Sequence, residues 1–252
     1  MVSLIAEPIF HLGAFPVTNA ILNTLFVDLV LLIFVILLRK DFKLVPNFLQ
    51  NATESIIKTF YDLTELIAQE RAKKIFPYFM SFFIFILIAN WSELIPGFSS
   101  IGFFHRTEHG KELIPFFRSA TSDLNATLAL AVISAVATHI LSIRVIGIKE
   151  YFKRYFSLNP INLFVGFLEI VSEFTKVVSL SFRLFGNIFA GGVVLGIISG
   201  ISALIIPIPF FLLEIIVGLV QALIFAMLTM VFMSILTTPH NPVHAKEVTL
   251  KE

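Results

Sequence analysis

Apolar residues dominate five long stretches of the chain, and polar residues gather between them. The stretches cover residues 21–38, 76–95, 124–148, 160–202 and 210–236. A helix needs about 17–25 apolar residues to cross the hydrocarbon core of a bilayer, so each stretch is long enough to cross. The fourth is about twice as long as a perpendicular helix requires, so it must tilt strongly or bend back. The pattern predicts an all-α polytopic membrane protein with five crossings, built as a single membrane domain over residues 1–252.

Residues 47–75 mix apolar and charged side chains at short intervals. The charged residues are Glu54, Lys58, Asp62, Glu65 and Glu70. Such a mixture suits an amphipathic helix that lies at the membrane interface better than one that crosses. Residues 1–20 come before the first apolar stretch and residues 237–252 follow the last one, so both segments are expected outside the hydrocarbon core.

Basic residues indicate the orientation of the five crossings. With the N-terminus outside, 13 of the 18 Lys and Arg residues fall in inner segments and three, Arg106, Lys111 and Arg118, fall in the long outer loop. Lys and Arg concentrate in the cytoplasmic segments of membrane proteins. The pattern therefore favours an outer N-terminal segment and an inner C-terminal tail.

Composition and motifs exclude several classes of function. The chain is 57% hydrophobic with a net charge of +1, so it has no basic field that would attract nucleic acid. It has no cysteine, which excludes disulfides, thiolate zinc sites and cysteine-ligated iron–sulfur clusters. No phosphate-cradling GxxxxGK[ST] motif occurs, so we expect no ATP chemistry in this chain itself, and neither a cofactor nor a metal is predicted.

Four charged residues and an amide recur on one face of the fourth stretch. They are Glu169, Glu173, Lys176, Arg183 and Asn187, and at about 100° per residue they form one stripe on an otherwise apolar helix. A charge facing lipid at mid-membrane costs roughly 2.5–3.5 kcal/mol or more, so the stripe must line a protein interface or a water-filled cavity. Glu173 and Lys176 could also form an ion pair that only holds helices together. Arg183 has no acidic residue within four positions, so its partner must come from elsewhere.

The last apolar stretch carries a second polar face. Glu214, Gly218 and Gln221 fall on one side of that helix, and the glycine permits close approach of a neighbour. Because this helix starts outside and the preceding one inside, Glu214 should lie toward the outer surface and Glu169 toward the inner. A carboxylate in each water-accessible cavity, with the permanent charge of Arg183 between them, is what a stepwise proton path needs.

Three other ionisable residues fall in or beside the apolar stretches. His139 is interpreted as a hydrogen-bonded core histidine, with a proton relay as the alternative. Asp28 in the first stretch and Glu93 near the outer end of the second are expected at interfaces, without an essential role.

Four segments resemble subunit a of the F-type ATP synthase, in the same order as in that family. They are ANWSELIPGF (89–98), SDLNATLALAV (122–132), SLSFRLFGNIFAGG (179–192) and EIIVGLVQALIFAMLTMVF (214–232). The RLFGN motif followed by a Q-A-x-I-F segment is highly specific, and the similarity extends from about residue 20 to residue 238.

The resemblance implies a stator subunit whose long tilted helices press against a rotating ring of c subunits. Its other partners would be b-type peripheral stalk subunits and the rest of the ATP synthase. Arg183 matches the essential arginine that faces the carboxylate of the ring and keeps the entry and exit half-channels apart. The other matches are Asn187 and Gln221 beside the arginine, Glu169, Ser172 and Lys176 in the inner half-channel, and Asp123 and Asn125 at the outer entrance. The helical stripe adds Glu173 to the inner set.

One position departs from the family pattern. Relatives often carry an ionisable residue nine positions after the arginine, where this chain has Gly192, and some have histidine where this chain has Glu214. The departure places more of the outer proton relay on Glu214.

Two other functions fit parts of the pattern. A secondary proton or cation transporter would use intramembrane charges in the same way, but it would commonly show inverted repeats, and the chain has no evident internal repeat. A membrane scaffold would not need the unpaired Arg183. The sequence leaves open whether H⁺ or Na⁺ is carried. A bacterial plasma membrane is the expected location, with a mitochondrial inner membrane as the alternative.

Overall fold

The computed structural model describes residues 8–13, 15–40, 47–95, 101–107, 110–116, 118–156, 160–201 and 206–238. The helices of this part are α1 (Asn19–Lys40), α2 (Phe48–Ala68), α3 (Ala72–Ser92), α4 (Leu124–Ile146), α5 (Ile148–Tyr155), α6 (Pro160–Ile201) and α7 (Pro207–Leu236), with 3₁₀ turns η1 (Gln69–Arg71) and η3 (Ala120–Ser122). Two antiparallel hairpins pair β1 (Pro8–Leu12) with β2 (Phe15–Thr18) and β3 (Gly102–Thr107) with β4 (Gly110–Pro115).

Five helical segments in the described part are long and apolar enough to cross a membrane. They are Asn19–Leu37, Gln50–Ser92, Leu124–Ile146, Leu163–Ile201 and Pro207–Leu236. Helices satisfy the backbone N–H and C=O groups internally, which the bilayer core requires because it offers no water. The all-α polytopic fold predicted from the apolar stretches is therefore confirmed.

The second of these segments is interrupted where α2 meets α3. Gln69 has φ 50°, in the left-handed region that a non-glycine residue rarely adopts, and the 3₁₀ turn η1 follows it. The apolar pattern put the boundary between the amphipathic and crossing helices at residue 75, whereas α3 begins at Ala72.

The two long C-terminal helices both begin at prolines. Pro160 opens α6, and Pro207 stands at the start of α7, where the missing N–H of proline would have no helical partner in any case. At about 1.5 Å per residue, the 42 residues of α6 extend about 63 Å, roughly twice the thickness of the hydrocarbon core. The length of α6 requires it to lie strongly tilted in a bilayer.

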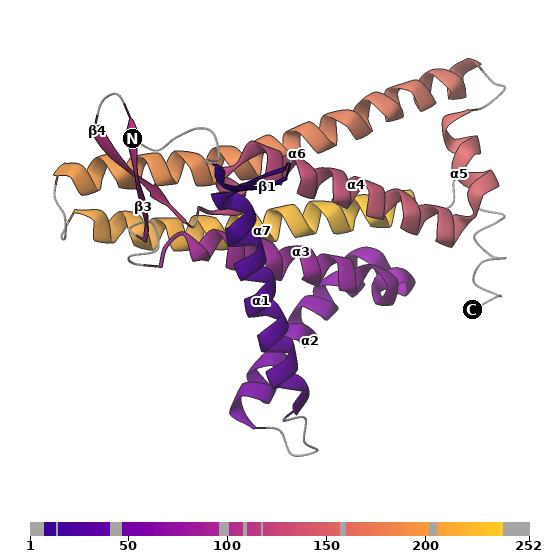
Figure 1. The fold of residues 1–252 in the computed structure, drawn as a ribbon. Helices are drawn as coiled ribbons and strands as arrows, with labels where there is room; N and C mark the ends of the chain where they lie inside the picture. Colours follow the sequence, from indigo (N-terminus) through magenta and orange to yellow (C-terminus); the bar gives the residue numbers. More distant parts are fainter. Residues whose placement is uncertain are drawn as a thin grey trace.

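Helices α3, α4, α6 and α7 pack together, and α1 runs across their direction (Figure 1). The core is formed mainly where α3 and α7 meet, with α4 and α6 alongside. Its fully buried large side chains include Ile75, Phe79, Leu184, Phe225 and Met230. This packing places the polar face of α7 against α3 and α6.

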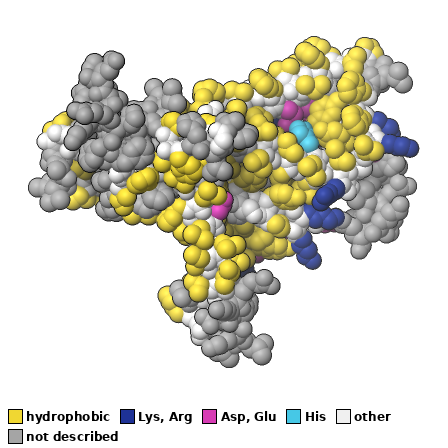
Figure 2. All heavy atoms as spheres, viewed as in Figure 1, with side chains coloured by type: hydrophobic (Ala, Val, Ile, Leu, Met, Phe, Trp, Pro, Cys, Tyr) yellow, Lys and Arg dark blue, Asp and Glu magenta, His cyan; other side chains and the backbone are white. Residues whose placement is uncertain are grey.

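Hydrophobic side chains cover most of the described surface on the face seen in Figure 2. Lys and Arg side chains gather at one end of that view, on the side where α5 lies. A hydrocarbon solvent explains the apolar cover, because such exposed side chains would otherwise face water. The predicted inner tail from residue 239 onward lies outside the described residues.

Candidate functional site

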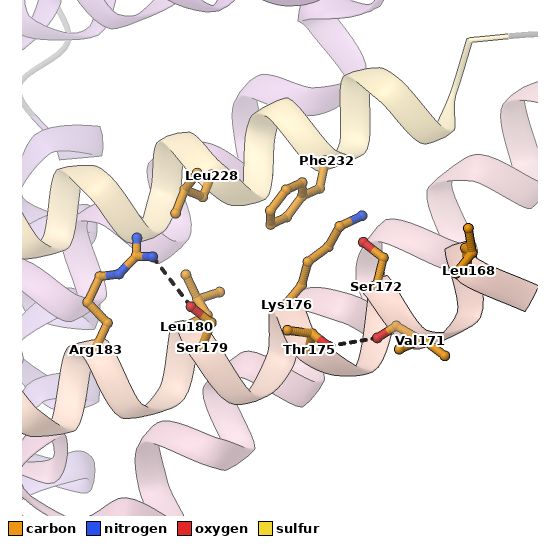
Figure 3. Close-up of a pocket in the computed structure, with 10 residues that line it drawn as sticks. All are labelled: Leu168, Val171, Ser172, Thr175, Lys176, Ser179, Leu180, Arg183, Leu228 and Phe232. Atoms are coloured by element: carbon orange, nitrogen blue, oxygen red, sulfur yellow. Dashed lines mark hydrogen bonds between the residues drawn. The ribbon is translucent and has the colours of Figure 1, made fainter. Parts of the chain in front are cut away.

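An open-sided cavity of about 470 Å³ runs along α6 where it faces α7 (Figure 3). Its lining residues are Leu168, Val171, Ser172, Thr175, Lys176, Ser179, Leu180 and Arg183 from α6, with Leu228 and Phe232 from α7. These α6 residues recur at helical spacing, which explains why one face of a single helix supplies most of the wall. The cavity brings together three residues of the predicted stripe and inner set, Ser172, Lys176 and Arg183.

Arg183 lies near the middle of α6 and is exposed in the isolated chain. Its guanidinium donates to Ser179 Oγ at 3.4 Å, and the described residues give it no carboxylate within ion-pairing distance. The prediction that its charge has no local partner is therefore consistent with the part of the chain that the structure describes. A desolvated guanidinium keeps its charge, so it needs an anion from another chain.

Glu173 forms an ion pair with Lys176, the second cationic side chain that lines the cavity. Its Oε1 accepts from Lys176 Nζ at 2.8 Å, and its Oε2 lies 3.9 Å from His139 Nε2. Tyr151 Oη lies 3.0 Å from His139 Nδ1, and the Lys176 ammonium lies 4.6 Å from the centre of the Phe232 ring. The internal ion pair that the sequence left open is present, and His139 is hydrogen-bonded.

Glu169 pairs with a residue that the sequence reading did not single out. Arg154 Nε donates to Glu169 Oε1 at 2.5 Å, and Arg154 Nη1 donates to the carbonyl of Ile235 at 3.3 Å. Arg154 thus joins α5, α6 and the C-terminal end of α7. Burial raises the pKa of the neighbouring Tyr155 phenol, so this hydroxyl stays protonated.

A second polar pair lies one helical turn beyond Arg183. Asn187 Nδ2 donates to Gln221 Oε1 at 2.8 Å, which links α6 to α7. Gln221 is buried, and its Nε2 has no hydrogen-bond partner among the described residues. The two amides that the resemblance placed beside the arginine therefore contact each other.

Glu214 is buried against α6 at Gly191, and Glu93 lies at the adjacent Gly192. A Cβ atom added at Gly191 would lie 2.1 Å from Glu214 Oε2, and one added at Gly192 would lie 3.1 Å from Glu93 Oε1. Glu93 follows α3, so the two carboxylates reach this point from different helices. The sequence predicts no essential role for Glu93. The only signal in the sequence is that this ionisable residue lies near the end of an apolar stretch.

Asp123 and Asn125 stand at the start of α4. The Asp123 carboxylate accepts from the Asn125 backbone N–H at 3.1 Å, so Asp123 is the N-cap of α4. Asp123 is buried and Asn125 is exposed. The cap gives Asp123 a structural role beside the one that the resemblance implies.

These features define a class of protein: a polytopic membrane protein with ionisable side chains lined up along tilted helices and with Arg183, which has no acid partner among the described residues, beside an open-sided cavity. Comparison with known proteins narrows the class. Residues 21–234 match the family model of the ATP synthase A chain, so the chain belongs to that family.

Curated relatives in bacteria are similar over most of their length. The ATP synthase subunit a of Moorella thermoacetica is 31% identical over 226 residues, covering 90% of this chain and 94% of the relative. That of Legionella pneumophila is 31% identical over 228 residues, covering 89% of each chain. A sodium ion specific subunit a from Propionigenium modestum is 35% identical over 222 residues, covering 86% of this chain and 73% of the relative.

Proposed function

We propose that this chain is the ion-conducting stator subunit of an ATP synthase, carrying protons through two aqueous half-channels that Arg183 keeps apart. The ions reach and leave a rotating ring of c subunits, and their flow drives the rotation that other subunits convert into ATP synthesis. The chain itself performs no ATP chemistry. Membership of the ATP synthase A chain family supports the assembly, and the geometry of α6 and α7 supports the path.

The observation that carries the proposal is Arg183, a permanent cation in the middle of an apolar helix, which the described residues leave without an acid partner. Leaving such a charge in hydrocarbon costs roughly 2.5–3.5 kcal/mol or more. The cavity beside it is open-sided, so an acid carried by another membrane helix can approach. A ring of c subunits, each with one intramembrane carboxylate, is a partner of that chemistry.

Ionisable and polar side chains lie in sequence on both sides of Arg183. Glu169, Ser172, Glu173 and Lys176 precede it on α6, with the first at the end where α5 packs. Asn187 follows it and contacts Gln221, and Glu214 lies further along at Gly191. The earlier group suits an inner half-channel. The later group, with Asp123 and Asn125 at the start of α4, suits an outer one.

Membership of the family supports the remaining partners, and the bacterial relatives support the location. A peripheral stalk of b-type subunits would hold this chain against the torque of the ring. Bacterial relatives of similar length support a bacterial plasma membrane. One relative is named as sodium ion specific, so the chemistry of the ring site would decide between Na⁺ and the proton that we propose.

Replacing Arg183 tests the proposal. In purified ATP synthase reconstituted into liposomes, Arg183→Ala should abolish ATP synthesis and ATP-driven proton pumping while the complex still assembles. Arg183→Lys should also lose most coupled activity, because an ammonium lacks the planar fork and can deprotonate when desolvated. Arg144→Ala, which removes an exposed arginine from the last turn of α4, is the matched control and should pump normally. Normal synthesis by assembled Arg183→Ala complexes would disprove the proposal.

A further inference from the structure

His139 of α4 forms a cluster with Glu173 and Lys176 of α6, which we call the His–Glu–Lys cluster. Glu173 Oε2 lies 3.9 Å from His139 Nε2, and Glu173 Oε1 accepts from Lys176 Nζ at 2.8 Å. One carboxylate thus faces an imidazole on one side and an ammonium on the other. Because a single negative charge serves two partners that can each be positive, the proton on His139 decides how strongly Glu173 holds Lys176.

Lys176 lies in the wall of the open-sided cavity, and Glu173 lies behind that wall. Lys176 and Arg183 both line the cavity of about 470 Å³, whereas Glu173 is not among its lining residues (Figure 3). Glu173 and Lys176 instead share with Thr138 a second cavity of about 20 Å³ between α4, α6 and α7, which has room for about one water molecule. The seven residues from Lys176 to Arg183 span about 10 Å of helix. Glu173 therefore acts on the larger cavity through Lys176.

The groups that face His139 come from α5 and α6. Tyr151 Oη of α5 lies 3.0 Å from His139 Nδ1, and Glu173 of α6 faces Nε2. The other ionisable groups of the neighbouring helices are Arg144 on α4, Lys149 and the Glu150–Lys153 pair on α5, Tyr155 and the Arg154–Glu169 pair between α5 and α6, and Glu214 toward the start of α7. Among the described residues, Glu173 is therefore the acid within ion-pairing distance of His139.

Protonation of His139 changes the charge of the cluster from zero to +1. With a neutral imidazole, the charges of Glu173 and Lys176 cancel. With an imidazolium, the ring N–H and the ammonium compete for one carboxylate, so Lys176 is held less firmly and its charge in the cavity wall is less neutralised. A positive wall repels a cation that passes between Arg183 and the inner water. Histidine changes its charge between about pH 5 and 8, so this change falls in the physiological range.

We propose that His139 and Glu173 are positioning residues that set the charge of Lys176 in the inner half-channel, and so make ion flow depend on inner pH. At high inner pH, Glu173 neutralises Lys176 and cations pass. At low inner pH, the His139 imidazolium shares Glu173, and the exposed ammonium slows the flow. The proton that the imidazole takes up returns to the inner water, so His139 itself carries no ion across the membrane. This inference rests on the proposed function.

The test uses purified ATP synthase in liposomes, with the inner side of the complex toward the bulk solution. ATP synthesis is driven at constant voltage and constant pH difference while the pH of both compartments is lowered together from about 8 to about 6. The variants are His139→Gln, Glu173→Gln, Glu173→Asp and the double variant His139→Gln with Glu173→Gln. Glu65→Gln, which neutralises an exposed acid on α2, is the matched control, and Arg183→Ala is measured in the same preparation.

Each rate per assembled complex is divided by the wild-type rate at the same pH, which cancels the pH dependence of the unchanged subunits. The ratio for His139→Gln should rise about twofold to fifteenfold as the pH falls, because it stays neutral where His139 gains a charge about 10 Å from the passing ion, at an effective dielectric constant of about 20 to 80. Glu173→Gln should already be slow at high pH, and Glu173→Asp should recover part of that rate. The ratio for Glu65→Gln should stay flat.

Because His139 acts through Glu173, the gain from His139→Gln at low pH should shrink below about twofold in the Glu173→Gln background. An undiminished gain in that background would overturn the inference. So would a His139→Gln rate per complex that follows the wild type at every pH, which marks a purely structural hydrogen bond, or one that falls below it at every pH, which marks a proton relay. With Arg183→Ala inactive, these results refute the positioning role alone. If Arg183→Ala retains synthesis, the proposed function fails and the positioning role with it.

Discussion

Arg183 and Glu214 show two ways in which the fold handles a charge inside a membrane. Arg183 is exposed on the isolated chain and its only described hydrogen bond is to Ser179, so its partner must arrive from outside. Glu214 is enclosed at Gly191, which has no side chain to displace it. An exposed permanent charge suits an electrostatic barrier, and an enclosed titratable group suits proton exchange.

Gly191→Ala should disable Glu214 without removing it. The new Cβ would lie within 2.4 Å of three carboxylate atoms, so Glu214 must move. Gly200→Ala is the matched control, because nothing lies within 4 Å of a Cβ there, and glycine to alanine favours a helix by about 0.5–1 kcal/mol at either site. We expect proton flux per assembled complex to fall at least about tenfold in Gly191→Ala, as on loss of an acid–base group, and to stay normal in Gly200→Ala. Equal flux in both variants would contradict the close fit.

The residues of the stripe were predictable because helical periodicity depends on sequence alone. Glu169, Glu173, Lys176 and Arg183 share a face at any tilt of α6. Their partners across helices were not predictable in this way. The bond from Arg154 to Glu169 and the placement of Glu93 at Gly192 join residues far apart in the chain, and no local pattern encodes them.

At the scale of elements, side chains of α3 donate hydrogen bonds to backbone carbonyls of α7. Asn90 Nδ2 donates to the carbonyl of Gly218 at 2.9 Å, and Trp91 Nε1 donates to that of Ile215 at 3.1 Å. Asn90 Oδ1 also accepts from the Thr121 hydroxyl at 2.7 Å. Small residues at such contacts let helix backbones approach, and polar side chains then bond across them.

Asn90→Ala should weaken this contact rather than ion conduction. It removes the donor to Gly218 and leaves the buried Thr121 hydroxyl without its acceptor, which costs about 1–3 kcal/mol. We expect a lower midpoint of thermal dissociation for the detergent-solubilised complex, with near-normal flux in the complexes that remain. Asn51→Ala, at an exposed position of α2, is the control and should leave the midpoint unchanged. An unaltered midpoint in Asn90→Ala would show that the bonds contribute no net stability.

The crossing helices were predictable because the bilayer imposes their length and forces their backbones to bond internally. The break at Gln69 and the two hairpins were not, because small local energies decide such details. No glycine or proline marks Gln69, although its φ is positive. The β3–β4 hairpin forms in a polar loop where apolar patterning gives little guidance.

At the scale of the whole molecule, α6 is the least buried of the five candidate spans. Large apolar side chains such as Phe167, Phe174 and Phe182 remain exposed along it, on the helix that also carries Arg183. Apolar side chains of a membrane helix can face lipid at no cost, but a charged side chain such as Arg183 needs a protein partner or water. The tilt required by its length lets this single helix present residues from near both membrane surfaces to one partner.

The two-sided path predicts that Glu214 and Glu169 are reached by water from opposite sides of the membrane. The chain has no cysteine, so a single cysteine gives a clean reporter. Thiols form reactive thiolates only where water reaches them, and Glu214→Cys and Glu169→Cys leave smaller side chains that Ag⁺ can approach.

We expect Ag⁺ supplied from the outside to label Glu214→Cys first, and Ag⁺ supplied from the inside to label Glu169→Cys first. Labelling is measured by mass spectrometry on oriented membrane vesicles, because both substitutions alter the path and activity would not separate the causes. Leu128→Cys, at an exposed apolar position of α4, should resist Ag⁺ from either side if that face meets lipid, and so controls for leakage. Glu169 and Glu214 substitutions that label equally from one side would mean that both positions open to the same water, and two half-channels separated by Arg183 could not then exist.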